Sequence, residues 1–213
     1  MKRAVIIDYQ LGNIFSVLQA CEHCNVRAVV STNPAEVLNS DYLILPGVGA
    51  FGDAMTSLSS MGLLYSIQTH VKAGKPLMGI CLGMQLLMSN SEEDGFHTGL
   101  NFIKGNVKRF PVVKLPDSSF SKVPQIQWNQ IKESNQIRWR DSPLKSLSSG
   151  SYMYFVHSYY VVPDNSKVIL ASSNYSNIDY SSAIQQDNIC AFQFHPEKSG
   201  EEGLTIYKNF FQQ

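Results

Sequence analysis

The sequence predicts an α/β fold: an open, mostly parallel sheet with helices on both faces. In the first half, helix-like segments near 13–25, 53–73 and 82–90 alternate with apolar, strand-like runs at 4–7, 27–30, 42–45 and 77–80. From about residue 100 to 195, short β-rich runs are separated by Asn, Ser, Asp and Pro turns. This second pattern favours a more antiparallel half.

The elements of the first half have local signals of their own. The run Ala4-Val5-Ile6-Ile7 predicts the first strand. The next segment, 13–25, is predicted to be a helix because apolar side chains recur on one face, at Ile14, Val17, Leu18 and Cys21. Pro76 introduces the strand at 77–80, and apolar residues at helical spacing follow from Leu82 to Met88.

In the second half, the strand-like runs lie at 152–162, 168–171 and 189–194. An amphipathic stretch over 201–211, with Leu204, Tyr207 and Phe211 on one side, predicts a closing helix. No internal repeat, low-complexity tract or linker divides the sequence, and 213 residues with 44% hydrophobic content suffice for a sizeable core. We therefore expect one domain over residues 1–213.

The charge balance limits the classes of partner. Lys and Arg number 17, as do Asp and Glu, so the formal net charge is zero. No overall positive field would attract nucleic acid or an anionic membrane, and small neutral or zwitterionic substrates fit better. The apolar run after the basic Lys2 and Arg3 is too short for a signal or spanning segment. We expect a cytoplasmic location.

Four cysteines, at 21, 24, 81 and 190, lack the density of a small disulfide-rich secreted protein, so disulfides are not expected. The pair Cys21-Glu22-His23-Cys24 has the spacing of a zinc or dithiol motif. No second pair with ligand spacing accompanies it, and Cys21 falls on the apolar face of the predicted helix. We favour a structural role for this pair and expect no metal.

The stretch Gly79-Ile80-Cys81-Leu82-Gly83 carries the strongest chemical signal. A cysteine between two glycines, after a strand and before a helix, is typical of a nucleophile on a sharp turn. The glycines leave room where a Cβ atom would crowd the turn, and the N–H groups of a following helix favour a thiolate and can hold an oxyanion. From this pentapeptide alone, a small buried core cysteine is an equally good interpretation.

A second signal lies at the end of the strand predicted at 189–194, where His195-Pro196-Glu197 follows. A cysteine hydrolase needs a base that takes the thiol proton and a carboxylate that orients the base. His195 and Glu197 are of the right types. Taken singly, such a histidine is more often structural and such a glutamate a solvated charge, but both interpretations weaken beside a nucleophile turn in the same chain.

These two motifs give the chain a resemblance to the class I (triad) glutamine amidotransferases, which join a cysteine turn to a distant His-Pro-Glu. Here the motifs are Gly79-Ile80-Cys81-Leu82-Gly83-Met84-Gln85 and His195-Pro196-Glu197. Within the family, the chain looks most like the glutaminase subunit of imidazole glycerol phosphate synthase. The blocks of this closer resemblance are Tyr9, Gly12-Asn13, Ser16, Leu45-Pro46-Gly47-Val48-Gly49, Tyr154-Phe155-Val156-His157-Ser158-Tyr159 and His195-Pro196-Glu197-Lys198-Ser199.

The resemblance implies a flavodoxin-like fold and hydrolysis of the glutamine side-chain amide. Cys81 would attack the carboxamide carbon, His195 would protonate the departing ammonia, and Glu197 would steer His195. No cofactor is implied.

Substrate contacts are also implied by the resemblance. A backbone N–H at Val48 or Gly49 would join that of Leu82 in stabilising the oxyanion. Without the resemblance, the loop is equally a glycine-rich turn after a buried strand. Gln85 would line the glutamine pocket; its position alone predicts only a solvated helix residue.

The resemblance further implies a partner, a (β/α)8 cyclase subunit that receives the ammonia. The resulting heterodimer would make imidazole glycerol phosphate and aminoimidazole carboxamide ribotide in histidine biosynthesis. The residues in blocks that face the partner in the family are Tyr9, Asn13, Trp128, Tyr154 and Lys198. Each also has a simpler interpretation as a core aromatic residue, a cap or a solvated charge.

One departure from the family pattern leaves alternatives open. The family usually has Pro-x-Met-Gly-Trp-Asn, whereas this chain has Pro124-Gln125-Ile126-Gln127-Trp128-Asn129, with Gln127 in place of glycine. A related glutaminase could supply ammonia to another acceptor, as in sugar amidination for surface polysaccharides. A stand-alone cysteine hydrolase of the same fold and a non-enzymatic binding module are further alternatives, and the joint presence of Cys81, His195 and Glu197 argues against the last.

Overall fold

The computed structural model describes residues 2–10, 13–114, 118–134 and 139–213, so Gly12 lies outside the described residues. Its main sheet has eight strands in the order β2-β1-β3-β4-β14-β13-β12-β9. Strands β2 to β14 in this order pair in parallel, and β13, β12 and β9 continue the sheet antiparallel. The strands are β1 (Arg3–Ile7), β2 (Arg27–Ser31), β3 (Tyr42–Leu45), β4 (Leu77–Ile80), β9 (Lys132–Glu133), β12 (Ile169–Tyr175), β13 (Ile178–Gln186) and β14 (Ile189–Phe192). The predicted fold class is confirmed.

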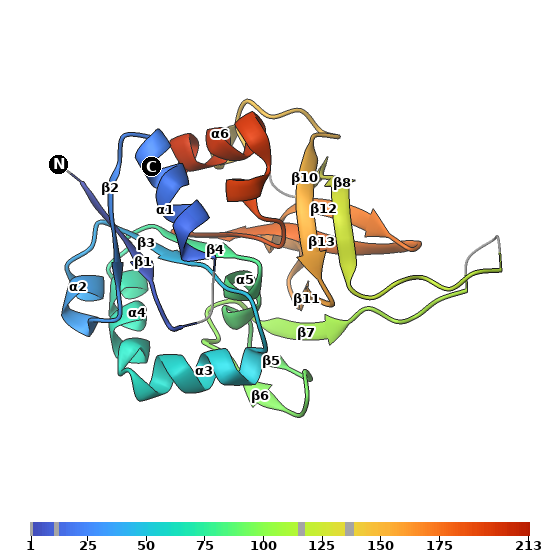
Figure 1. Ribbon diagram of the computed structural model, residues 1–213, viewed down its shortest axis with the longest axis horizontal. Helices are drawn as coiled ribbons and strands as arrows, with labels where there is room; N and C mark the ends of the chain where they lie inside the picture. Colours follow the sequence, from blue (N-terminus) through green and yellow to red (C-terminus); the bar gives the residue numbers. More distant parts are fainter. Residues whose placement is uncertain (1, 11–12, 115–117, 135–138) are drawn as a thin grey trace.

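Helices cover both faces of this sheet, as Figure 1 shows. Side chains of β1 alternate between the faces: Ala4 and Ile6 pack in one core cluster with α1 and α6, whereas Val5 and Ile7 pack in a second cluster with helices from α2 to α5. The helices are α1 (Ile14–His23), α2 (Pro34–Leu38), α3 (Phe51–Ser60), α4 (Leu63–Lys72), α5 (Leu82–Leu86) and α6 (Gly200–Phe210). The two-sided burial explains why β3, β4 and β14 are apolar and buried at every position.

The helices differ from the prediction in three places. The segment 53–73 forms two helices, α3 and α4, because Gly62 adopts a left-handed conformation (φ 69°) between them. Helix α2 was not predicted, although Asn33 caps it by accepting a hydrogen bond from the Ala35 N–H and Pro34 starts it. Helix α5 ends at Leu86, and the chain then turns into β5 instead of continuing to residue 90.

The remaining strands form two small sheets. One has the order β11-β7-β5-β6 and the other pairs β10 with β8. The predicted run at 152–162 is therefore two strands, divided at Ser158, that belong to different sheets. The strands are β5 (Asn90–Ser91), β6 (His97–Thr98), β7 (Gly105–Arg109), β8 (Gln125–Gln130), β10 (Tyr152–His157) and β11 (Tyr159–Pro163).

Strand β14 decides where the two chemical motifs meet. It comes from the half that predicts antiparallel pairing, yet it pairs in parallel with β4. The Cys81 N–H donates to the Phe192 carbonyl at 2.8 Å, which ties the ends of the two strands together. Carboxyl ends of parallel strands are where open α/β sheets bind ligands.

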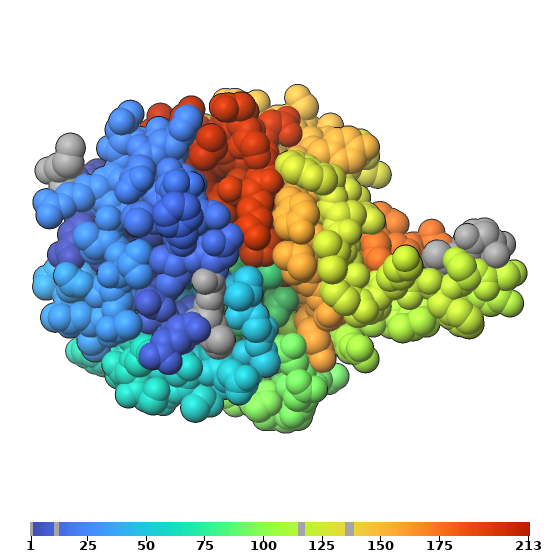
Figure 2. All heavy atoms as spheres, viewed as in Figure 1, coloured from blue at the N-terminus to red at the C-terminus, as the bar shows by residue number. Residues whose placement is uncertain are grey.

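One face of the molecule carries the elements around these strand ends. Figure 2 shows α6 in red between α1 in blue and the β10–β8 sheet in orange and yellow-green. The closing helix was predicted at 201–211 and spans Gly200–Phe210, with Tyr207 and Phe210 fully buried. No helix of the described segments combines the length and apolar character needed to cross a bilayer.

Candidate active site

Cys81 lies on the sharp turn between β4 and α5. Its backbone is strained, with φ 53° and ψ −107°, a region that side-chain-bearing residues rarely occupy. A Cβ atom on Gly83 would lie 1.8 Å from the Leu45 carbonyl oxygen, and one on Gly79 would lie 3.0 Å from the Gly83 carbonyl oxygen. The flanking glycines are therefore required for close backbone approach, as the sequence predicts.

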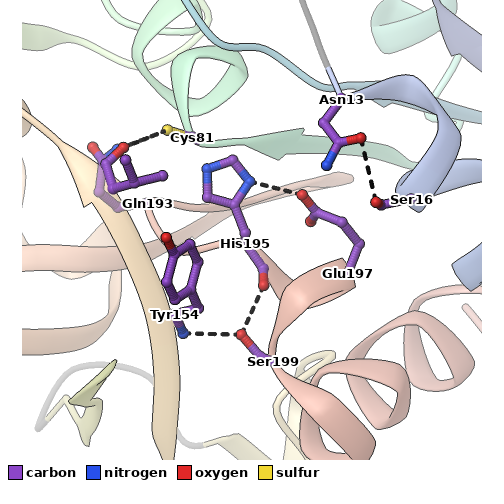
Figure 3. Close-up of polar contacts among 9 residues, drawn as sticks. Asn13, Ser16, Cys81, Tyr154, Gln193, His195, Glu197 and Ser199 are labelled. Atoms are coloured by element: carbon purple, nitrogen blue, oxygen red, sulfur yellow. Dashed lines mark hydrogen bonds and ion pairs between the residues drawn. The ribbon is translucent and has the colours of Figure 1, made fainter. Parts of the chain in front are cut away.

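His195 and Glu197 follow β14 and lie beside this turn. His195 Nδ1 contacts Glu197 Oε1 at 2.7 Å, and the two side chains are only 3% and 1% exposed. The backbone N–H of His195 donates to the Tyr154 carbonyl at 2.9 Å, which fixes the backbone from which the imidazole projects. Figure 3 shows the other ring nitrogen, Nε2, on the side of Cys81. The imidazole thus stands between the thiol and the carboxylate.

The electrostatics of His195 reflect both neighbours. Burial alone lowers the pKa of His195, because it penalises the charged imidazolium. The charge of Cys81, followed by the hydrogen bond and charge of Glu197, outweighs burial and raises that pKa to about 10. An imidazolium whose charge is stabilised by a buried carboxylate can keep a proton at neutral pH and release it to a leaving group.

Two further groups contact the sulfur of Cys81. The side-chain amide of Gln193 donates from Nε2 to Sγ at 3.7 Å, and Sγ can donate to the Val156 carbonyl at 3.8 Å. Gln193 is completely buried. Its Oε1 accepts from Gln85 Nε2 at 3.2 Å, and the same Gln85 nitrogen donates to the Tyr159 carbonyl at 3.1 Å. Both hydrogens of the Gln85 amide nitrogen are thereby used, which leaves its oxygen to face a ligand.

A cavity of about 280 Å³ opens beside the thiol. It contains Cys81 together with all four residues predicted for the oxyanion and substrate, Val48, Gly49, Leu82 and Gln85. The remaining lining comes from residues that the sequence analysis did not single out for it, namely Glu93, Pro124, Val156, His157, Ser158 and Tyr159.

Two of these additional residues have unusual environments. Burial raises the pKa of the Glu93 carboxyl, which accepts the Phe51 N–H at 2.8 Å. Burial lowers the pKa of His157 to about 4, so this imidazole is neutral at physiological pH. Its Nδ1 lies 2.8 Å from the Tyr159 carbonyl and must carry the proton, since a carbonyl can only accept.

The loop after β3 approaches the same turn. The Leu82 N–H donates to the Gly47 carbonyl at 3.4 Å, so a protein oxygen occupies one of the two expected oxyanion donors. The Tyr9 hydroxyl donates to the Pro46 carbonyl next to it. Tyr9 is fully buried, and burial raises its pKa far above the usual value. Its side chain supports this loop and is not available to a partner, contrary to the expectation from the sequence.

The other predicted interface residues do reach the surface. Trp128 is 51% exposed and stacks edge-on against Tyr154, with 6.1 Å between ring centroids. Lys198 is exposed, and its ammonium lies 5.9 Å from the Tyr154 ring centroid. Asn13 is half-buried at the start of α1 and accepts a hydrogen bond from the Ser16 hydroxyl at 3.3 Å. Three of these side chains, on β8, β10 and the turn after β14, form one continuous surface.

Comparison with known proteins decides the family. The sequence profile described as glutamine amidotransferase class-I matches residues 5–213. This chain belongs to the class I glutamine amidotransferases. Its likeness to solved structures agrees on the fold. "Structure of PurLQS from Thermotoga maritima" matches with a TM-score of 0.73 at 16% identity, covering 99% of this chain and 98% of that chain.

Curated relatives of this amidotransferase are similar over nearly their whole length. Imidazole glycerol phosphate synthase subunit HisH of Syntrophotalea carbinolica is 47% identical, covering 97% of this chain and 98% of that protein. The protein of the same name in Methanosarcina acetivorans is also 47% identical, with 100% and 99% covered. That of Aquifex aeolicus is 44% identical, with 98% and 95% covered.

The Cys21 and Cys24 pair lies at the C-terminal end of α1. Cys21 is buried at the end of α1, and burial raises the pKa of both thiols, which disfavours the thiolate that a metal or redox reaction needs. All four cysteines carry free thiols. In the described part of the chain, no three His, Cys, Asp or Glu side chains are grouped to hold a metal ion.

Proposed function

We propose that this chain is a glutaminase subunit of imidazole glycerol phosphate synthase, which hydrolyses the side-chain amide of L-glutamine with Cys81, His195 and Glu197. The observation that carries the proposal is the buried imidazole between a strained cysteine and a carboxylate, at the wall of a cavity. The curated relatives named above support the choice of synthase. A reduced compartment such as the cytoplasm suits a working thiol.

The chemistry follows from the positions of these three side chains. The sulfur of Cys81 attacks the amide carbon of glutamine, and the carbonyl oxygen becomes an oxyanion. His195 gives its proton to the amide nitrogen, the C–N bond breaks, and ammonia leaves a γ-glutamyl thioester. His195 then takes a proton from water, whose oxygen attacks the thioester and releases glutamate. Glu197 holds the imidazole in orientation and stabilises its charged form throughout.

The cavity offers groups of the right charge for an amino-acid substrate. Glu93 lines the cavity, and its carboxyl group has the charge that complements the α-ammonium group of glutamine. The free side-chain oxygen of Gln85 can accept a further N–H. Hydrolysis of a primary amide places no requirement on a metal. We assign Glu93 and Gln85 to recognition of the glutamine ammonium and amide groups.

The oxyanion donors require one local rearrangement. The Gly47 carbonyl now accepts the Leu82 N–H, so the N–H of the Gly47–Val48 peptide points away from the cavity. Rotation of that peptide would free the Leu82 N–H and bring the Val48 N–H toward the substrate oxygen. Gly49, at φ 105°, gives the chain the freedom to adopt either arrangement.

We assign the surface around β8 and β10 to the cyclase partner, a (β/α)8 barrel that consumes the ammonia. Ile126 and Tyr152 are 59% and 54% exposed, and together with Trp128 they leave large apolar side chains uncovered on this two-stranded sheet. Figure 2 shows this sheet on the same face as α1 and α6. The surface adjoins His195 through Tyr154, whose ring centroid is 6.5 Å from the imidazole. Ammonia released at His195 would therefore leave next to the partner.

Gln127 is the reason to consider a second acceptor for the ammonia. It is exposed on β8, where the family usually has glycine, and it lies on the opposite face of the strand from Ile126 and Trp128, so it changes the edge of the proposed contact region and not its apolar face. A cyclase-like partner that aminates another acceptor, such as a sugar, would use the same triad.

The experiment is glutamate release from glutamine by the purified chain, with and without a histidine-pathway cyclase and its nucleotide ligand. Strong stimulation by the cyclase, abolished in Cys81→Ser, supports the proposal. Full activity without any partner would instead identify a stand-alone hydrolase. No stimulation by this cyclase but stimulation by a sugar-amidinating partner would establish the second acceptor.

A further inference from the structure

We propose that Gln193 is a positioning residue of the glutaminase reaction: its side-chain amide donates a hydrogen bond to the nucleophilic sulfur and orients the substrate-binding Gln85. The inference rests on the proposed function for its consequences in catalysis. Its central contact, between Gln193 Nε2 and Cys81 Sγ at 3.7 Å, is a property of the free chain. Figure 3 shows Gln193 on the far side of Cys81 from Glu197.

The orientation of the Gln193 amide follows from a chain of hydrogen bonds. The Tyr159 carbonyl can only accept, so the Gln85 nitrogen must face it, at 3.1 Å. The second hydrogen on that nitrogen reaches Gln193, 3.2 Å away, which must therefore present its oxygen. The Gln193 nitrogen is then left on the side of the sulfur. A backbone carbonyl thus dictates, through two glutamines, that a donor faces Cys81.

A donor in this position favours the nucleophilic form of cysteine. A thiolate accepts an N–H hydrogen bond more strongly than a thiol does. The Val156 carbonyl acts in the opposite direction, since it can only accept from a protonated thiol, at 3.8 Å. Gln193 and His195 thus stabilise the thiolate, and Val156 opposes them.

The same amide links the nucleophile to the substrate pocket. Gln85 lines the cavity, and its nitrogen is held by Gln193 on one side and Tyr159 on the other. Loss of the Gln193 oxygen would release one of these two restraints, so Gln85 would no longer hold its oxygen toward the substrate. A residue that merely filled space in the core would affect neither the thiol nor the pocket.

The test measures the reactivity of the Cys81 thiol in the absence of glutamine, so it does not depend on the glutaminase assignment. The chain is treated with iodoacetamide over a range of pH, and alkylation is read by mass spectrometry on the peptide that carries Cys81, because three other thiols are free. In Gln193→Met, the pH of half-maximal alkylation should rise, with a rate at pH 7 about tenfold lower than in the wild type, as expected for loss of one hydrogen bond to a charged group. In Gln193→Glu, a carboxylate faces the sulfur, and the rise should be larger.

Gln186→Met is the matched control. Its amide donates to the Phe102 carbonyl at 3.4 Å on the neighbouring strand β13, and this variant should keep the wild-type alkylation profile. Glutamine kinetics then add a second readout, in which Gln193→Met raises KM as well as lowering kcat. An alkylation profile equal to that of the wild type in either folded Gln193 variant would overturn the proposal. A shifted profile in a chain without glutaminase activity would instead refute the proposed function and retain the role of Gln193 at the thiol.

Discussion

The contact between His195 and Glu197 supports a quantitative prediction for Glu197→Gln. The two side chains are 3% and 1% exposed and 2.7 Å apart, so this is a buried pair rather than a surface salt bridge, which would contribute only about 0–1 kcal/mol. Removing one partner of a buried charge pair costs about 3–5 kcal/mol. If that cost falls on the step that needs a charged imidazole, kcat should fall by roughly 10²- to 10⁴-fold.

We expect the fall in kcat to lie near the lower end of this range, for a structural reason. The glutamine amide is the same size as the carboxylate and can still present its oxygen to the His195 Nδ1–H, which would retain a neutral hydrogen bond and lose only the charge. The pKa of His195 should also fall, because the hydrogen bond and charge of Glu197 help to raise it.

The assay is glutamate release in the stimulated complex, together with thermal unfolding to establish that the variant folds. Glu202→Gln is the matched control, since Glu202 is exposed and its Oε1 accepts the Ser151 hydroxyl at 2.7 Å; the kcat of this variant should stay at the wild-type value. A folded Glu197→Gln chain with a kcat within a factor of about five of the wild type would refute the reasoning.

Three further predictions concern the groups around the triad. Because the charge of Cys81 leads the causes that raise the pKa of His195, Cys81→Ser should lower that pKa in an NMR titration, and an unchanged value would contradict the pairing. Unfolded His157 takes up a proton below pH 6.5, whereas the folded chain does so only near pH 4, so stability should fall by about 3 kcal/mol as pH drops through this window. In urea unfolding, His157→Asn should lose about 3 kcal/mol less stability than the wild type over this pH window. An equal loss in the two proteins would refute the prediction. Gly83→Ala should lower the free energy of unfolding by at least about 3 kcal/mol, because its Cβ would lie 1.8 Å from a backbone oxygen. Gly200→Ala should lower it by only about 1 kcal/mol, because that position has φ 63° but open space around it. Equal losses would show that the turn at Gly83 tolerates a side chain.

The sequence predicts well where a local pattern has one structural solution. Strands at 42–45 and 77–80 have the predicted bounds, because short apolar runs bounded by turns leave little choice when both faces are buried. The glycines around Cys81 predict the sharp turn for the same reason. Helix α2 was missed despite its cap at Asn33 and its proline, so its signal was present in the sequence.

Other features depend on contacts that no local pattern contains. The role of Gln193 follows only from the parallel pairing of β14 with β4, which brings residues far apart in sequence to one sheet edge. Gln193 precedes His195 by two residues, a spacing that places both side chains on one face of an extended segment. That spacing does not predict that the Gln193 amide contacts the Cys81 sulfur. Tyr9 was expected at a surface and is buried under the Pro46 carbonyl, since aromatic residues serve both interfaces and cores.

The most direct test of the central claim is to capture the covalent intermediate. The complex is mixed with glutamine labelled in its carbon skeleton, quenched in acid during turnover, digested and analysed by mass spectrometry. The account predicts a γ-glutamyl group on the sulfur of Cys81 in the wild type, and on no residue in Cys81→Ser. Label on a different side chain, or undiminished glutamate release by Cys81→Ser, would contradict it.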